Sequence, residues 1–322
     1  MDKRIIEAQI KKFPKVVLED QFDDILAYLH QPIDYRSVME RICANTTFSD
    51  PERKEFLFRC IKAVAKIVKY MTMHDIPPYF LEKNWDPAKL SENHISYQDL
   101  LQVLCSKNGK LASYAPITNE VDFYKDIETH CRRLKDEQGQ FNYYTFDDIA
   151  VHELNHVAST TLITSTDNDY ITTFFKKFYG IDITKDNQVA MTGAAVYSTN
   201  HDPINFQTNE LLTNNITNRI NGTNFPELID LIYKMLMLLN EKQVATGYYT
   251  TNNDATEKHF SYLADDRKRL LAISDSEYNI EVYYELLRLC KKHCLQTAAI
   301  IKQDILSNPK LCSNGRKLIR SL

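Results

Sequence analysis

Glycine is scarce in this chain, with seven residues among 322. Because glycine supplies most of the left-handed backbone positions of tight turns, so few glycines favour helices over a fold built from many hairpins. The sequence also lacks an apolar run near the roughly 20 residues that a membrane helix needs, so no membrane partner is expected. The longest candidate, 228–239, is interrupted by Asp230 and Lys234 and is interpreted as a buried amphipathic helix.

An excess of basic charge is missing too. The formal net charge is -4, so the chain carries no electrostatic footprint for nucleic acid. Charged residues occupy the first positions after Met1, where the apolar region of a secretory signal would begin. We therefore expect a cytoplasmic protein, or one exported without a cleavable signal peptide. The seven cysteines are odd in number and irregularly spaced, which indicates reduced thiols.

Helical periodicity dominates the first part of the chain. We expect helices over 5–29 with a break at Pro14, from Pro51 to about residue 75, over 96–106 and over 120–136. The segment 79–92 is interpreted as an ordered loop. Residues 1–138 are therefore predicted to form a helical N-terminal region.

A short β-prone stretch interrupts the helical pattern of the second part. Small and β-branched residues over 188–197 predict a small sheet or hairpin. Further helices are expected over 206–219, 226–240, 252–274 and 277–306. The predicted class is therefore mainly α with a small β-sheet (α+β). The favoured boundary near residue 138 separates 1–138 from 139–322, and one continuous domain is the alternative.

The most informative motif is His152-Glu153-Leu154-Asn155-His156. Thr145 and Asp148 form a weak capping-box pattern, which predicts a helix from Phe146 to about Thr164. On that helix His152 and His156 project from one face at positions i and i+4. The surrounding residues are apolar, and buried histidines without partners would cost free energy, which a metal ion offsets. The pattern H-E-x-x-H is the signature of zinc metallopeptidases, which predicts a Zn²⁺ site.

A second motif, Asn209-Glu210-Leu211-Leu212-Thr213-Asn214, follows downstream. It resembles the N-E-x-x-x-D motif of the gluzincin metallopeptidases, with Asn214 in place of the aspartate. The resemblance implies that Glu210 is the third metal ligand and that Asn214 orients a metal-binding histidine through its amide oxygen. The spacing of 54 residues from His156 (210 - 156) exceeds that of compact gluzincins. Alternative third ligands are Glu227, Glu241 and His201.

The resemblance further implies a zincin-like catalytic core within 139–322 that hydrolyses peptide bonds in a protein or peptide substrate. Glu153 would act as general base on a zinc-activated water. A downstream side chain would stabilise the oxyanion, with His259 favoured. The other candidates for that role are Tyr248, Tyr249, Tyr262 and Arg267. Residues 188–197 or Phe141–Tyr144 would supply an edge strand for the substrate.

Two non-enzymatic interpretations remain open on the sequence. The first is a zinc-bearing scaffold or binding protein without turnover, which the neutral Asn214 favours. The second is a helical interaction protein whose H-E-x-x-H motif is coincidental. Bound zinc separates the second from the other readings, and hydrolysis separates the enzyme from the scaffold. The oligomeric state does not follow from the sequence.

Overall fold

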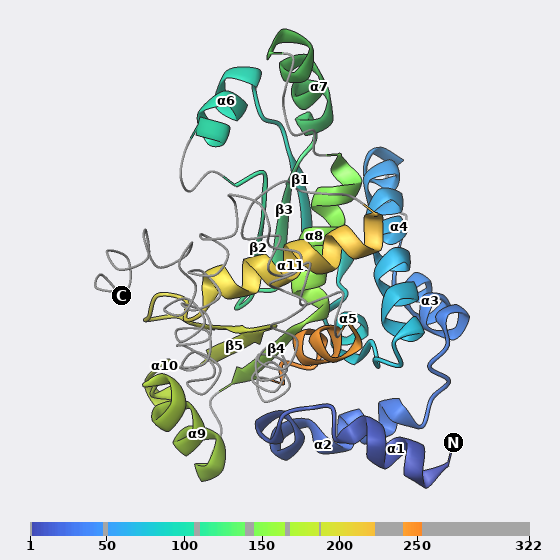
Figure 1. The fold of residues 1–322 in the computed structure, drawn as a ribbon, viewed down its shortest axis with the longest axis vertical. Helices are drawn as coiled ribbons and strands as arrows, with labels where there is room; N and C mark the ends of the chain where they lie inside the picture. The colour runs from blue at the N-terminus through green and yellow to red at the C-terminus, as the bar shows by residue number, and fades with distance from the viewer. Residues whose placement is uncertain are drawn as a thin grey trace, which may run out of the picture. The chain divides into compact units, whose positions relative to one another are not determined.

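The computed structural model describes residues 2–47, 51–105, 110–138, 145–164, 168–186, 188–222 and 241–252. The chain divides into two compact units. The first is Met1–Asn224 with Tyr248–Asn252, and the second is Phe225–Gly247 with Asn253–Leu322. All labelled helices and strands belong to the first unit (Figure 1). Residue 138, at which the sequence predicts a boundary, lies inside that unit.

Several predicted elements lie outside the described residues. They are the helices over 226–240 and 277–306, nearly all of the helix over 252–274, and the strand Phe141–Tyr144. Residues 241–249 are helical and are drawn in orange in Figure 1.

Five helices form the N-terminal part of the first unit: α1 (Lys3–Ile10), α2 (Lys15–Leu29), α3 (Tyr35–Ala44), α4 (Pro51–Met73) and α5 (Tyr79–Asn84). Pro14 is the N-cap of α2, so the predicted break there is confirmed. The apolar stripe of α4 is buried, because Val64, Ile67 and Met71 recur on one helical face. The segment predicted as a loop instead contains α5, the 3-10 turn Pro87–Lys89 and strand β1 (Leu90–Asn93).

A first three-stranded sheet has the order β1-β3-β2. Strand β3 (Glu120–Tyr124) pairs parallel with β1 and antiparallel with β2 (Ala112–Ala115). The helix predicted over 120–136 is therefore wrong in its first part. Val121 and Phe123 are buried, Glu120 and Asp122 are exposed and Tyr124 is half-buried, and this period-two pattern suits a strand. The flanking helices are α6 (Tyr97–Cys105) and α7 (Ile127–Gln138).

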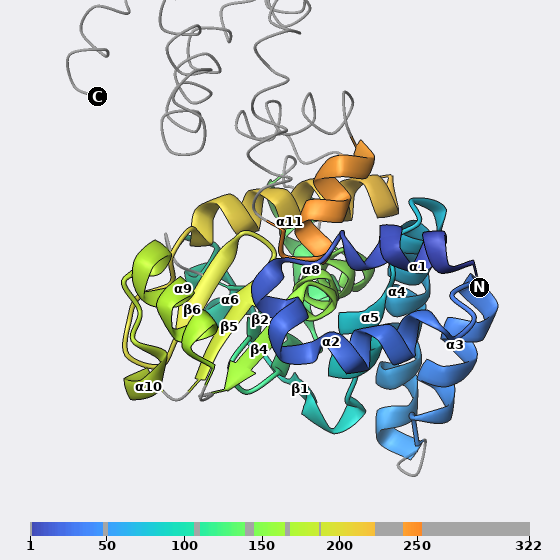
Figure 2. The same cartoon turned by 90° about the horizontal axis from the view of Figure 1, so that it is seen from below.

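The second sheet is antiparallel and has the order β4-β5-β6. Helix α8 (Phe146–Ala158) ends earlier than predicted, and β4 (Thr160–Thr164) follows directly because its β-branched residues favour a strand. The predicted hairpin is confirmed by β5 (Gln188–Thr192) and β6 (Ala195–Ser198). Helices α9 (Asp169–Tyr179) and α10 (Ile183–Asp186) lie between β4 and β5 in the chain and beside the sheet in Figure 2.

Helix α8 occupies the centre of the first unit. Helices α4 and α5, strand β2 and α11 (Phe206–Asn221) all pack against it, and α11 crosses it in Figure 1. Eleven of its thirteen residues are buried, Glu153 and His156 among them. The predicted α+β class is confirmed. None of the described helices combines the length and apolar composition needed to cross a membrane.

Candidate metal centre

Helix α8 carries the H-E-x-x-H motif on a well-defined helical frame. Its first turn is closed by the predicted capping box: the backbone N–H of Asp148 donates to Thr145 Oγ1 at 3.1 Å, and Asp148 accepts the Thr145 N–H at 3.1 Å. One turn apart, His152 and His156 leave the same face of the helix. Their Nε2 atoms lie 3.2 Å from each other.

Helix α11 is held in register on α8 by polar contacts. Buried Asn155 donates from Nδ2 to Thr217 Oγ1 at 3.1 Å, and Asn221 Nδ2 donates to Asp148 Oδ1 at 3.0 Å. Because an unpaired buried amide is costly, these bonds disfavour sliding of one helix along the other. This register carries Glu210, near the start of α11, to a position over the two histidines.

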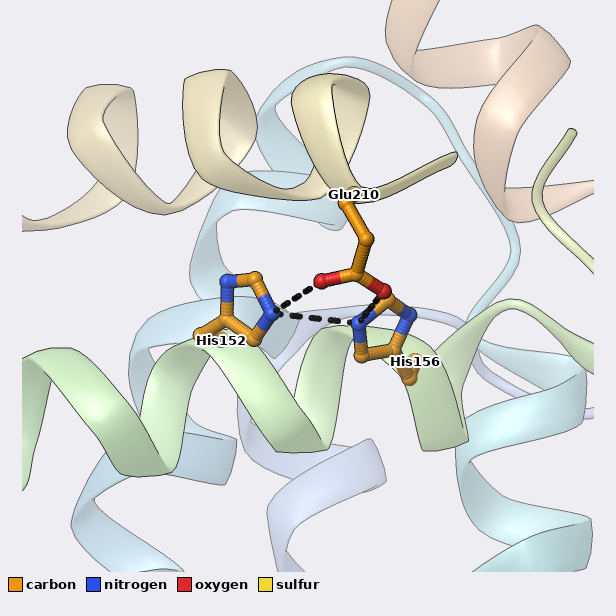
Figure 3. Close-up of side chains that lie close together, drawn as sticks. All are labelled: His152, His156 and Glu210. Carbon is orange, nitrogen blue, oxygen red and sulfur yellow. Dashed lines mark hydrogen bonds and ion pairs between the residues drawn. The ribbon is translucent and has the colours of Figure 1, made fainter. Parts of the chain in front are cut away.

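Figure 3 shows the Glu210 carboxylate pointing from α11 down to both imidazoles of α8. Glu210 Oε1 lies 3.2 Å from His156 Nε2, and Oε2 lies 3.3 Å from His152 Nε2. One ligand atom from each of the three residues falls within 4.8 Å of the others. The structure thus brings together His152 and His156 of α8 and Glu210 of α11, although Glu210 follows His156 by 54 residues in the chain.

These separations fit a metal ion. Donors about 2.0–2.1 Å from a tetrahedral ion lie roughly 3.3 Å from one another. The two imidazole nitrogens and the nearest carboxylate oxygens are separated by 3.2–3.3 Å. The side chains therefore form a candidate metal-binding triad, whose nitrogen and oxygen donors match several divalent metals.

Of the rival third ligands, His201 pairs instead with Asp186, at 3.4 Å between Nε2 and Oδ2. Glu227 lies outside the described residues, and Glu241 belongs to the second compact unit. Within the described part of the chain, Glu210 is the carboxylate that completes the group around the two histidines.

Opposite effects act on the ionisation of the triad. Burial by itself lowers the pKa of His152, but its hydrogen bond to Glu210 and the charge of that carboxylate outweigh burial, and the pKa rises above 6.5. Burial by itself raises the pKa of Glu210, but the charge of His156 and the hydrogen bonds from both histidines bring it well below its usual range. A negative carboxylate facing two imidazoles is a strong attractor for a cation.

Glu153 is buried beside the triad and is 8% exposed. Desolvation raises the pKa of its carboxyl, and the nearby histidines oppose that rise. Beside a candidate metal site, a carboxyl with a raised pKa takes up a proton more readily than an exposed glutamate does. The remaining triad neighbours are Asn214, which hydrogen-bonds to His152, and Asn209, whose Nδ2 lies 3.2 Å from His156 Nδ1.

Two tyrosines near the centre were not singled out from the sequence. The Tyr114 ring, on β2, is nearly parallel to the His156 ring, at 8° and 6.4 Å between centroids. Tyr197, on β6, hydrogen-bonds to Asn209, and burial and the charges of Glu210 and Glu153 raise its pKa. Both lie within strands far from the motif in sequence, so only an explicit prediction of strand pairing would have found them.

The favoured oxyanion residue His259 lies outside the described residues, as do Tyr262 and Arg267. Tyr248 and Tyr249 are described and are buried behind the triad. Tyr248 hydrogen-bonds to Thr213, and Tyr249 donates to Asn155 Oδ1 at 2.5 Å. The expected substrate strand over 188–197 spans two strands of this sheet: β5 (188–192) is central, whereas β6 (Ala195–Ser198) is an outer strand of the described sheet. The alternative, Phe141–Tyr144, lies outside the described residues.

No known protein family, curated protein or solved structure matches this chain.

Proposed function

We propose that this protein is a zinc-dependent metallopeptidase, and the observation that carries the proposal is the convergence of His152, His156 and Glu210 at separations that suit one ion. Two histidines and one carboxylate are a ligand set of catalytic zinc sites. Such sites leave one coordination position open, whereas structural zinc sites fill all four with protein ligands. When bound, zinc supplies Lewis acidity that polarises a carbonyl and lowers the pKa of water.

Glu153 is the general base of the proposed reaction. It follows His152 directly on α8, and its raised pKa lets it accept a proton from the attacking water and return it to the leaving amine. Of the three residues between the histidines, Leu154 and Asn155 carry no titratable group, so Glu153 is the residue of that stretch that can take up the proton.

Tyr197 is the proposed oxyanion donor, in place of His259. Its pKa is raised by burial and by nearby carboxylates, so the hydroxyl keeps its proton at neutral pH. A protonated phenol can donate to a developing oxyanion, whereas a buried carboxylate cannot. Its hydrogen bond to Asn209, the neighbour of Glu210 in the chain, supports a position beside the triad.

Strand β2 is the proposed backbone-binding edge for an extended peptide. In the described part of the chain it is one of the two outer strands of its sheet, it contacts α8, and it carries Tyr114. An added strand gains main-chain hydrogen bonds along such an edge.

The experiment compares the wild type with Glu153→Gln. Elemental analysis of both purified proteins should find one zinc per chain, and cleavage of an unfolded protein substrate should be lost in the variant and in chelator-treated wild type. Full cleavage by Glu153→Gln would overturn the assignment. Zinc without cleavage in wild type would favour the scaffold function, which the uncharged Asn214 beside His152 supports. No zinc at all would overturn both.

A further inference from the structure

The orientation of the His156 imidazole depends on the donors and acceptors around its Nδ1 atom. This inference rests on the metal-binding part of the proposed function. An imidazole that binds a metal through Nε2 carries its proton on Nδ1. That N–H needs an acceptor, because His156 is only 5% exposed. Two side chains lie close to Nδ1: Asn209, with Nδ2 at 3.2 Å, and Thr213, with Oγ1 at 3.5 Å.

Asn209 cannot be that acceptor. Its Oδ1 accepts the backbone N–H of Ala194 at 3.0 Å, and a backbone N–H can only donate. The amide therefore presents its NH₂ group to His156, where it can donate to Nδ1 only while that nitrogen carries no proton. Turning the amide over would set its NH₂ group against the Ala194 N–H. Gly193 closes the space around it, since a Cβ at that position would lie 2.3 Å from Asn209 Oδ1.

Thr213 has the required polarity. Its hydroxyl donates to the Asn209 carbonyl oxygen at 2.8 Å, which uses its single proton and leaves its lone pairs free. The Tyr248 hydroxyl lies 2.8 Å from Thr213 Oγ1 and so must be the donor of that pair. Tyr248 is 1% exposed, and burial raises its pKa, so its phenol stays protonated. Thr213 is thus left as an acceptor for one more donor.

We propose that Thr213 and Tyr248 are positioning residues of the metal centre. Thr213 accepts the Nδ1–H of His156 and thereby presents the Nε2 lone pair to the ion. Tyr248 fixes the Thr213 hydroxyl in the orientation in which it can accept. Tyr248 is therefore a component of the metal centre, although 23 residues of the second unit (225–247) precede it in the chain.

The experiment measures zinc affinity by competition with a chromophoric chelator. We compare wild type with Thr213→Val, which keeps the shape and removes the hydroxyl, and with Thr213→Ser, which keeps the hydroxyl. Loss of such a supporting partner weakens metal binding about 10- to 100-fold. We expect that loss for Thr213→Val, a weaker loss on the order of 10-fold for Tyr248→Phe, and near wild-type affinity for Thr213→Ser.

The double variant Thr213→Val/Tyr248→Phe tests whether Tyr248 acts on His156 through Thr213. Because Tyr248 acts through Thr213, the double variant should bind zinc no more weakly than Thr213→Val alone. The matched control is Tyr28→Phe, which also removes a buried tyrosine hydroxyl with a hydrogen bond, in this case to Glu82 at 2.5 Å. It should lower thermal stability and leave zinc affinity unchanged.

The outcomes separate this inference from the proposed function. If wild type binds zinc and both Thr213→Val and Tyr248→Phe bind it within about twofold of wild type, the positioning role is wrong and the metal site stands. Equal losses in Thr213→Val and Thr213→Ser would also overturn the role of the hydroxyl. If wild type binds no zinc, the proposed function and this inference fall together.

Discussion

The Nε2 atoms of His152 and His156 lie 3.2 Å apart, with the Glu210 carboxylate facing both. Two imidazole nitrogens this close share one proton or one cation between them. The three residues come from two helices, α8 and α11, between which the chain forms three strands and two further helices. A cation that binds them therefore ties α8 to α11.

Zinc should raise the melting temperature of the protein. A ligand that binds only the folded state at 100 times its Kd stabilises that state by about 2.7 kcal/mol. We expect a zinc-dependent increase in Tm by calorimetry that a chelator reverses. His156→Ala should unfold at a temperature that zinc does not change, and an equal zinc effect in that variant would place the binding elsewhere.

The zinc-dependent increase in Tm should grow with pH. Burial lowers the pKa of His152, but Glu210 outweighs burial and raises that pKa above 6.5. In the metal-free protein the His152 imidazolium therefore stabilises the fold below pH 6.5, and this stabilisation is lost as the pH rises through the raised pKa. Glu210 has a pKa depressed from 4.5, so its contribution is present above pH 4.5 and lost at lower pH.

In the metal-free protein, the ion pair of His152 and Glu210 therefore stabilises the fold most between pH 4.5 and 6.5. Zinc needs the deprotonated imidazole and competes with the proton there. The difference in Tm with and without zinc, measured from pH 5 to 8, should be smallest at the acid end. A difference that shrinks toward pH 8 would contradict the assignment of His152 as a ligand.

Tyr197→Phe should reduce cleavage without loss of zinc. Removal of one oxyanion donor lowers kcat by roughly 100- to 1,000-fold. Steady-state kinetics and elemental analysis on the same preparations separate the two effects. The control is Tyr170→Phe, on α9, which should keep wild-type kcat because Tyr170 packs against a core cluster that contains none of the triad residues. Wild-type kcat in Tyr197→Phe would remove this residue from the reaction.

Asn214→Asp should tighten zinc binding. Asn214 hydrogen-bonds to His152, and a carboxylate there would add negative charge that favours the cation-bound imidazole. We expect a gain on the order of 10-fold in affinity, measured by chelator competition. Unchanged or weaker binding would show that the neutral amide is already the better partner at this site.

Gly193→Ala should destabilise the protein and weaken zinc binding together. Gly193 has a φ of +52°, and a Cβ there would lie 2.3 Å from Asn209 Oδ1 and 2.6 Å from the Tyr248 ring. Such overlap costs about 1–3 kcal/mol in addition to the backbone strain. Gly180→Ala has a φ of +70° with nothing within 4 Å, so it should cost only the strain, about 1–2 kcal/mol, and spare zinc affinity.

Some elements could be predicted because their signals are local. The capping box of Thr145 and Asp148, the break at Pro14 and the hairpin over 188–197 depend on residues next to each other in the chain. The errors at 120–124 and 160–164 arose where a helix and a strand are consecutive. In each of them the predicted helix included residues that form a strand, because their β-branched or alternating pattern is short. Pairing with the partner strands decides whether such a short run is a strand or part of the helix.

The sequence by itself determined that His152, Glu153 and His156 share one helical turn, because the 3.6-residue period fixes that from spacing alone. The sequence also predicted Glu210 as the third metal ligand and Asn214, four residues later on a second helix, as the partner of a metal-binding histidine. Only the tertiary structure decided that Glu210 reaches the imidazoles, because the crossing of α8 and α11 is set by buried contacts such as Asn155 with Thr217. The places of Thr213, Tyr197 and Tyr248 were likewise decided by packing between segments that no local pattern connects.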